Sequence, residues 1–281
     1  MTEPPRIDAH QHFWHPARGD YGWLTPALGT IHRPFAPKDL VPLLERHGID
    51  GTVLVQAAPT VTETEYLLGI ADTHSFVKGI VGWVDFTDPG AGKRDLERLA
   101  GHPKIKGFRP MIQDIADPDW VTGSGLDWAF EAIASRGLVF DALVKPHQLA
   151  ALRTRLVHHP GLKVVVDHGA KPAIRERALA GWAEDIAAIA RDTAAFCKLS
   201  GLVTEAGAEW CIDDLRPYTD HLLRCFGPER LVFGSDWPVV TRASSYDRWI
   251  ETAEALLAGL GPAQRAAVFG GNAARLYGLA D

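Results

Sequence analysis

Two histidines close to the N-terminus have the spacing of a metal site. His10 and His12 lie in the segment DAHQHFW, residues 8–14, at the end of a short apolar run. Side chains alternate across an extended strand, so the two imidazoles are expected to point to the same side. Two imidazoles at that spacing can hold one first-row metal ion. His-x-His pairs are also common on exposed loops, so the prediction depends on the fold bringing this pair to a reactive centre.

Three further polar residues end apolar segments in the same way. His168 ends the run VVVDH, Asp236 follows LVFGS, and Arg109 follows IKGF. Each has an ordinary alternative role, because a histidine or aspartate can bond to nearby backbone and an arginine can lie on the surface. Asp236 could take a proton from water, and the histidine and the aspartate could bind a cation. The guanidinium of Arg109 could donate hydrogen bonds to a substrate oxygen. We predict Asp236, His168 and Arg109 as catalytic residues, and His10, His12, His168 and Asp236 as metal ligands.

Other side chains at the ends of apolar segments are candidates for a pocket wall. Polar groups there can bind substrate, and the flat indole faces of tryptophans, including Trp23, can stack on a sugar ring. Simple packing is the alternative for each of them. The predicted substrate-binding residues are Trp14, Gln56, Trp83, Asp141, Lys198 and Trp237.

Eight apolar segments recur along the chain, with helical patterns between them. Nearly continuous β-branched runs such as KVVV at 163–166 are typical of parallel strands covered on both faces. The expected strands are 6–10, 51–56, 77–84, 105–110, 137–143, 163–168, 196–202 and 231–236. The clearest helices are expected at 37–47, 126–136, 179–192, 216–226 and 246–260. Gly48 and Gly137 are placed as C-caps, and Asn272 as the N-cap of a terminal helix.

Strict alternation through eight strands predicts an α/β fold, a closed (β/α)8 TIM-type barrel. Barrels of roughly 250 residues commonly form one domain, so residues 1–281 are expected to be a single domain. An open doubly wound sheet is the alternative, but no Gly-x-Gly-x-x-Gly loop follows the first strand. In a barrel the first and eighth strands are neighbours, which would bring Asp236 to face the two first-strand histidines. The long connection 13–35 has no convincing helix and is expected to lie over the barrel mouth.

Composition narrows the classes of partner. A net charge of −6 argues against nucleic acid or an anionic membrane as the main partner. No apolar run approaches the roughly 18 residues that span a bilayer. Cys197, Cys211 and Cys225 form no CxxC pair and cannot all pair within the chain, which favours a reduced, cytoplasmic setting. The expected partner is a small molecule, and self-association into a homo-oligomer stays open.

Six motifs spread over the chain carry a family resemblance. They are DAHQHFW at 8–14, IKGFR at 105–109, VDH at 166–168, KLSG at 198–201, GSDWP at 234–238 and GNAARLY at 271–277. With them the chain resembles the amidohydrolase superfamily, in the amidohydrolase-2 branch that contains sugar lactonases. Within that branch it is similar to L-fucono- and L-rhamnono-lactonase-like proteins. The resemblance covers essentially the whole length.

The resemblance implies roles for four residues, and the chain also differs from the pattern of the binuclear members. His10 and His12 match the first-strand ligands, His168 the sixth-strand histidine and Asp236 the eighth-strand aspartate. Binuclear members carry a carboxylated lysine or a glutamate where this chain has Arg109, and the fifth-strand histidine of many members is absent. The resemblance therefore implies one divalent metal, Zn²⁺, rather than two. Relatives that hydrolyse lactones without metal leave a metal-independent mechanism open.

These expectations combine into a hydrolase that opens a small lactone, such as a sugar aldonolactone. Asp236 would take a proton from water, while the metal, with His168 or Arg109, would stabilise the oxyanion. The alternative is a metal-dependent decarboxylase of an aromatic or dienoic acid, with Arg109 gripping the carboxylate. A sugar-acid-binding protein without catalysis is a third reading, which the intact Asp236 disfavours. The sequence does not specify the lactone or its ring size.

Overall fold

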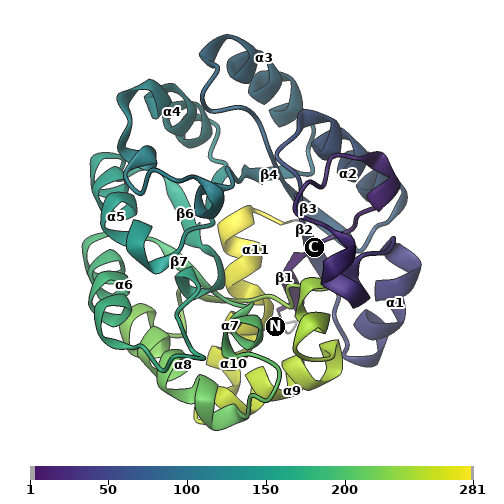
Figure 1. Cartoon of the computed structure of the whole chain (residues 1–281), viewed down its shortest axis with the longest axis vertical. Coiled ribbons are helices and arrows are strands. Elements are labelled where there is room, and N and C mark those ends of the chain that lie inside the picture. Colours follow the sequence, from purple (N-terminus) through teal and green to yellow (C-terminus); the bar gives the residue numbers. More distant parts are fainter. Residues whose placement is uncertain (1–3, 280–281) are drawn as a thin grey trace.

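Eight parallel strands form one sheet in the order β1 to β8 (Figure 1). The computed structural model describes residues 4–279. All eight expected strands are present, most of them one to three residues shorter than expected at one end or both. Their bounds are β1 Ile7–Gln11, β2 Gly51–Val55, β3 Val77–Gly82, β4 Ile105–Phe108, β5 Val139–Ala142, β6 Lys163–Val166, β7 Phe196–Leu199 and β8 Leu231–Phe233.

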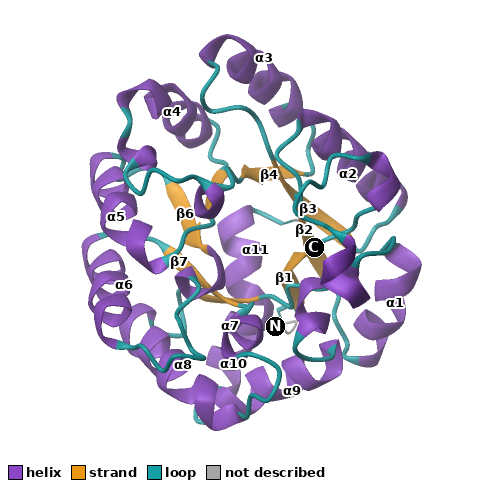
Figure 2. Ribbon diagram, in the orientation of Figure 1, coloured by secondary structure: helices purple, strands orange, loops and turns teal. Residues whose placement is uncertain are grey.

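Hydrogen bonds between the ends of β1 and β8 bring the first and last strands together. The Asp236 N–H donates to the His10 carbonyl at 2.8 Å, and the His12 N–H donates to the Trp237 carbonyl at 2.7 Å. Gln11 and Trp237 form an isolated parallel bridge at the same place. Figure 2 shows the resulting ring of strands inside a ring of helices. The predicted (β/α)8 barrel is therefore confirmed, and the open sheet is excluded.

Helices follow the strands along the chain and surround the ring, except α11, which lies across one end of it. Their bounds are α1 Pro37–Arg46, α2 Val61–Thr73, α3 Pro89–Ala100, α4 Asp127–Ser135, α5 Leu149–His158, α6 Ala180–Asp192, α7 Leu202–Ala206, α8 Ile212–Phe226, α9 Tyr246–Leu256, α10 Pro262–Ala266 and α11 Asn272–Tyr277. Gly48 and Gly137 follow helices with φ of +59° and +64°, as their predicted capping role requires. Asn272 is not an N-cap: it is the first residue of α11, and its amide donates to the carbonyls of Pro228 and Leu231.

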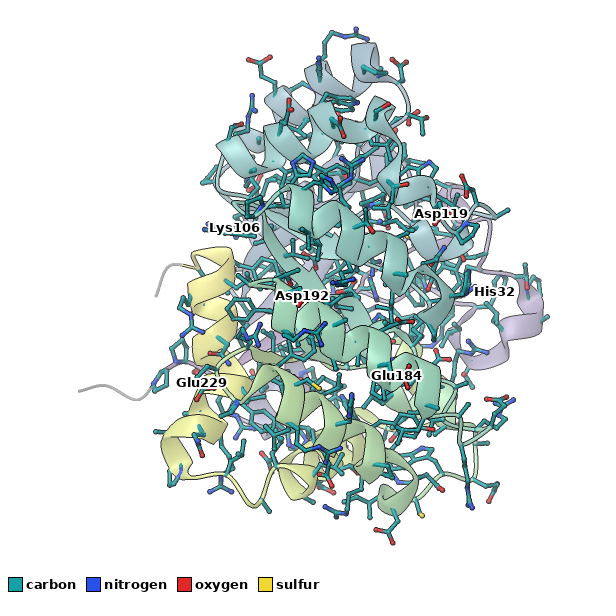
Figure 3. All side chains as sticks on the ribbon, turned by 90° about the vertical axis from the view of Figure 1, so that its left-hand side faces the viewer. His32, Lys106, Asp119, Glu184, Asp192 and Glu229 are labelled. Atoms are coloured by element: carbon teal, nitrogen blue, oxygen red, sulfur yellow. The ribbon has the colours of Figure 1, made fainter. Side chains whose placement is uncertain are left out.

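Apolar side chains fill the barrel interior, and α11 closes one end of it. Inward residues of the strands pack with Ala273, Leu276 and Tyr277 of α11 in one cluster. Lys106, at the start of β4, donates to the Gly278 carbonyl just after α11 at 3.0 Å. Figure 3 shows Lys106 at the same end as α11, with His32 and Asp119 toward the opposite side. The amino ends of the strands are thus covered, and the carboxyl ends are left for a site.

The connection from β1 to α1 contains two short 3₁₀ helices, Pro16–Arg18 and Pro26–Ile31, where no helix was expected. Two backbone hydrogen bonds join the start and the end of this connection. The Trp14 N–H donates to the Phe35 carbonyl at 3.2 Å, and the Phe35 N–H donates to the Trp14 carbonyl at 2.9 Å. Across residues 4–279, no helix has both the length and the apolar character needed to cross a membrane. Cys197, Cys211 and Cys225 all have free thiols.

Candidate active site

Three imidazoles converge on one carboxylate oxygen at the carboxyl ends of β1, β6 and β8. Asp236 Oδ1 lies 3.3 Å from His12 Nε2, 3.8 Å from His10 Nε2 and 3.9 Å from His168 Nε2. All four side chains are buried. The structure thus brings together the four predicted metal ligands. His12, His168 and Asp236 line a cavity of about 190 Å³ that Arg109 also lines, while His10 lies behind them.

Two of these residues, His168 and Asp236, have an unusual backbone conformation. His168 has a φ of +54° and Asp236 a φ of +58°, in the left-handed region that is unfavourable for residues with a side chain. Hydrogen bonds fix both positions, because the Asp236 N–H is held by β1 and His168 Nδ1 lies 2.8 Å from Ser200 Oγ. Left-handed non-glycine residues are enriched at functional sites, where the surrounding structure holds the strain.

The hydrogen bonds of His12 indicate a cation between the converging atoms. His12 Nδ1 lies 2.7 Å from the Val55 carbonyl, an acceptor, so Nδ1 carries the proton. In the neutral imidazole, Nε2 then directs a lone pair at Asp236 Oδ1, which is also an acceptor. A proton or a metal ion must lie between two such atoms. Ligands of a tetrahedral ion at about 2.0–2.1 Å are separated by roughly 3.3 Å. The distance between His12 Nε2 and Asp236 Oδ1 has this value, whereas those from His10 and His168 are longer, at 3.8 and 3.9 Å.

Charges in the site favour an ionised carboxylate and neutral imidazoles. Burial opposes ionisation of Asp236, but the three neighbouring imidazoles, His168 first, outweigh it and hold the pKa of this carboxyl below its ordinary value. Burial lowers the pKa of His168 to about 4. Neutral histidine and ionised aspartate are the forms that bind metal. A carboxylate with a low pKa is a weak base, so it can deprotonate water efficiently only if a cation acidifies that water.

Two fixed cations adjoin His10: Arg109 lies in the cavity wall, and Lys198 is fully buried on the other side of the ring. Lys198 Nζ lies 3.1 Å from His10 Nδ1, and Arg109 Nη1 lies 3.3 Å from His10 Nε2. Asp167 links the cations, at 3.0 Å from Lys198 and 3.2 Å from Arg109. Burial and the Lys198 ammonium hold the pKa of His10 well below its ordinary value. Lys198 and Arg109 therefore place positive charge at both ring nitrogens of His10.

Three of the predicted substrate-binding residues, Gln56, Asp141 and Lys198, lie beneath the cavity and bond to other protein groups. Lys198 and Asp141 pair at 2.5 Å inside the barrel, with both side chains fully buried. Gln56 donates to the Arg109 carbonyl at 2.7 Å and so supports the backbone of the β4 tip. Within the described chain none of the three belongs to the cavity wall, and all three side chains are fully buried.

The predicted tryptophans are likewise absent from the cavity wall described here. Trp14 is fully buried, and its indole N–H donates to the carbonyls of Ile31 and Arg33. Trp237 packs against Phe35 with ring centroids 5.2 Å apart. Trp83 follows β3 and does not line the cavity either. Trp14 and Trp237 therefore belong to the packing of the first connection.

The aromatic wall of the cavity comes from Trp23, on the first connection. Its indole N–H donates to the Ala57 carbonyl at 2.6 Å. Ala57 is in turn held by the buried carboxylate of Glu63, which accepts the Ala57 N–H at 3.0 Å. The remaining wall, which sequence reasoning missed, comes from loop residues: Ala57, Met111, Gln113, Asp114, Leu143, Lys171, Val239 and Arg242. Their sequence signal is weak, since they follow strand ends at varied distances.

Comparisons with known proteins agree with this geometry. The sequence model of a family described as amidohydrolase matches residues 7–279. The chain belongs to the amidohydrolase family. This amidohydrolase is 44% identical over 276 residues to the L-fucono-1,5-lactonase of Burkholderia ambifaria, with 97% of this chain and 95% of that protein covered. It is 36% identical over 300 residues to the L-fucono-1,5-lactonase of Burkholderia multivorans, with 98% and 97% covered.

A crystal structure also resembles this amidohydrolase closely. An amidohydrolase from Burkholderia multivorans with bound zinc superposes with a TM-score of 0.91 at 36% sequence identity. The match covers 98% of this chain and all of that one. The family that the six motifs indicated is therefore confirmed, as is the barrel predicted from the alternation of strands and helices.

Proposed function

We propose that this amidohydrolase hydrolyses the ester bond of a small sugar lactone of the L-fucono-1,5-lactone type. The observation that carries the proposal is the convergence of three imidazole nitrogens on Asp236 Oδ1 at the floor of the cavity. The cavity volume of about 190 Å³ is below the roughly 300–1,000 Å³ of sites for drug-sized ligands, so it suits a single sugar ring. Two relatives at 44% and 36% identity support the lactone as the substrate class.

Asp236 is the general base of the proposed reaction. Its carboxylate is ionised, lines the cavity and accepts a proton from a water molecule as that water attacks the lactone carbonyl. The same proton then passes to the ring oxygen that leaves as an alcohol. The products are a hydroxy acid and, at neutral pH, one released proton.

Arg109 is the residue that faces the developing oxyanion. Asp167 and the Gln56 carbonyl accept hydrogen bonds from its guanidinium and hold it rigid in the cavity wall. A fixed, charged donor in a buried site stabilises negative charge on an oxygen without reorganising. His168 adds a second nitrogen on the same wall.

One divalent ion, Zn²⁺ by the donor set, would be held by His10, His12 and Asp236, with His168 adjacent. When bound, it would supply Lewis-acid polarisation of the carbonyl oxygen and acidify the attacking water. The guanidinium beside His10 provides a second source of positive charge for the same transition state.

A panel of aldono-1,4- and 1,5-lactones, with L-fucono-1,5-lactone included, tests the proposal. Acid release in a weak buffer is followed for the wild-type protein and for Asp236→Asn at the same concentration. Turnover of at least one lactone well above the spontaneous rate, lost in the variant, is the expected result. No turnover of any lactone would refute the proposal. Carbon dioxide release from an aromatic or dienoic acid would point to the decarboxylase alternative.

A further inference from the structure

Two cationic side chains line the cavity without carboxylate partners. Lys171 and Arg242 both lie in its wall, together with Asp236. Within residues 4–279, neither side chain forms an ion pair, although ion pairs are common elsewhere on this protein. Lys171 is half-buried and Arg242 is exposed at the rim. Unpaired cations in a concave site are suited to bind an anion.

The acidic residue on the neighbouring helix does not neutralise this pair. Glu205, in α7, interacts with both Lys171 and Arg242, but burial outweighs them and raises the pKa of its carboxyl. A tight ion pair would lower that pKa instead. Glu205 forms no ion pair with Lys171 or Arg242 within residues 4–279, so both side chains are available to an anion in the cavity.

The backbone around Lys171 is strained in a way that aims the side chain. Four consecutive residues, 168–171, are left-handed, with φ of +54°, +56°, +60° and +51°. Three of the four have side chains, for which this conformation is unfavourable. The Lys171 N–H donates to the His168 carbonyl at 2.9 Å, closing one left-handed turn. Residues three apart in such a turn share a face, so the turn directs Lys171 and His168 to the same cavity.

We propose that Lys171 and Arg242 form a carboxylate-binding subsite that holds the ring-opened hydroxy acid produced by hydrolysis. This inference rests on the proposed lactonase function. A sugar lactone is neutral, and its negative charge appears only when the ester bond is cleaved beside Asp236. Two unpaired cations in the same small cavity then bind the product more tightly than the substrate. The subsite gives the enzyme charge-dependent product inhibition.

The test compares the acid with a neutral analogue of the same carbon skeleton. Binding of L-fuconate and of L-fucitol is measured by titration calorimetry on Lys171→Met, Arg242→Met and the wild-type protein. Loss of one charged contact is expected to weaken L-fuconate binding about ten- to hundredfold, with little change for L-fucitol. Lys163→Met is the matched control, since Lys163 is exposed at the opposite end of β6 and should bind L-fuconate as the wild type does.

A second variant separates charge from backbone conformation. Asparagine tolerates the left-handed region better than lysine, so Lys171→Asn should raise the melting temperature by about 2 °C while still losing L-fuconate affinity. Lys171→Met, which keeps the strain, should lose affinity without this gain. Both results are expected if the strained backbone at Lys171 is retained because the lysine side chain is needed to bind the carboxylate.

Several outcomes would overturn the subsite. They are no saturable binding of L-fuconate to the wild type, equal losses for L-fuconate and L-fucitol, or preferential turnover of an anionic lactone such as glucaro-1,4-lactone that depends on Lys171. The last would assign the cations to a substrate carboxylate instead. Because these measurements need no turnover of a neutral lactone, they remain interpretable if the lactonase proposal itself fails.

Discussion

Lys198 Nζ lies 2.5 Å from Asp141 Oδ2 inside the barrel, with both side chains fully buried. The ammonium also adjoins Asp167 at 3.0 Å, and Arg109 contacts the same carboxylate at 3.2 Å. Burial raises the pKa of Asp141 to about 6 even with this partner present. The Lys198–Asp141 ion pair therefore lies directly beneath the site. Loss of this pair should lower the free energy of unfolding of the whole barrel.

Lys198→Met should lower the free energy of unfolding by about 3–5 kcal/mol, because it leaves the buried carboxylate of Asp141 without its counter-charge. Lys198→Met combined with Asp141→Leu should recover part of that loss. Urea unfolding followed by circular dichroism measures both, with Lys163→Met as a surface control. A loss below about 1 kcal/mol for the single variant would contradict the assignment.

Asp236→Asn preserves the shape of the side chain but removes the base. We expect kcat to fall by about 10²–10⁴, the usual contribution of a general base. Asp114→Asn, on the same cavity wall, should keep most of the activity and serves as the matched control. Steady-state kinetics with both variants decides the point, and a kcat for Asp236→Asn within tenfold of the wild type would exclude the base role.

Metal content tests the ligand assignment independently of the substrate. Elemental analysis of protein produced with zinc should give about one equivalent, and His12→Ala should lower both metal content and activity. His158→Ala, an exposed histidine on α5, is the control. Full activity of protein shown to contain no metal would leave Arg109 as the electrophile and remove the ion from the mechanism.

Acid should destabilise the metal-free protein through His168. The pKa of His168 is lowered to about 4 in the folded state, whereas an unfolded histidine titrates near 6.5. The unfolded state therefore binds more protons between these values, so stability falls as the pH drops from about 6.5 to 4. The whole effect is up to about 3 kcal/mol. His168→Gln should show a shallower slope in chelator-treated samples; an unchanged slope would contradict the shift.

The sequence was sufficient for the barrel because strands such as β2 and β6 are short, almost continuously apolar runs that alternate with helical patterns. Runs such as residues 163–166 have no polar alternation, which restricts them to a sheet covered on both faces. The ends of strands then located Asp236 and His168, since all carboxyl ends of a parallel barrel meet at one mouth. The observed strands begin or end up to three residues from their predicted bounds, but their carboxyl ends still meet at the same mouth.

The direction of each side chain could not be predicted from its place at a strand end. The pairing of β1 is irregular between Asp8 and Gln11, so simple alternation does not hold there. Lys198 lies one residue before the end of β7 and points to the barrel interior rather than to the mouth. Lys171 and Trp23 come from connections whose conformation depends on contacts far away in sequence, such as the bond from Trp23 to Ala57.

The closure of the barrel by α11 has a consequence for synthesis of the protein. Tyr277 donates its hydroxyl hydrogen to Asp141 Oδ2 at 2.8 Å, so the helix contributes directly to the buried charge network. α11 leaves the ribosome after all eight strands, and until it docks, water can reach Asp141 and Lys198 from the amino ends of the strands. A nascent chain that stalls before residue 272 therefore lacks the low-dielectric floor beneath His10. The buried network beneath the site is therefore complete only when α11 has docked against the amino ends of the strands.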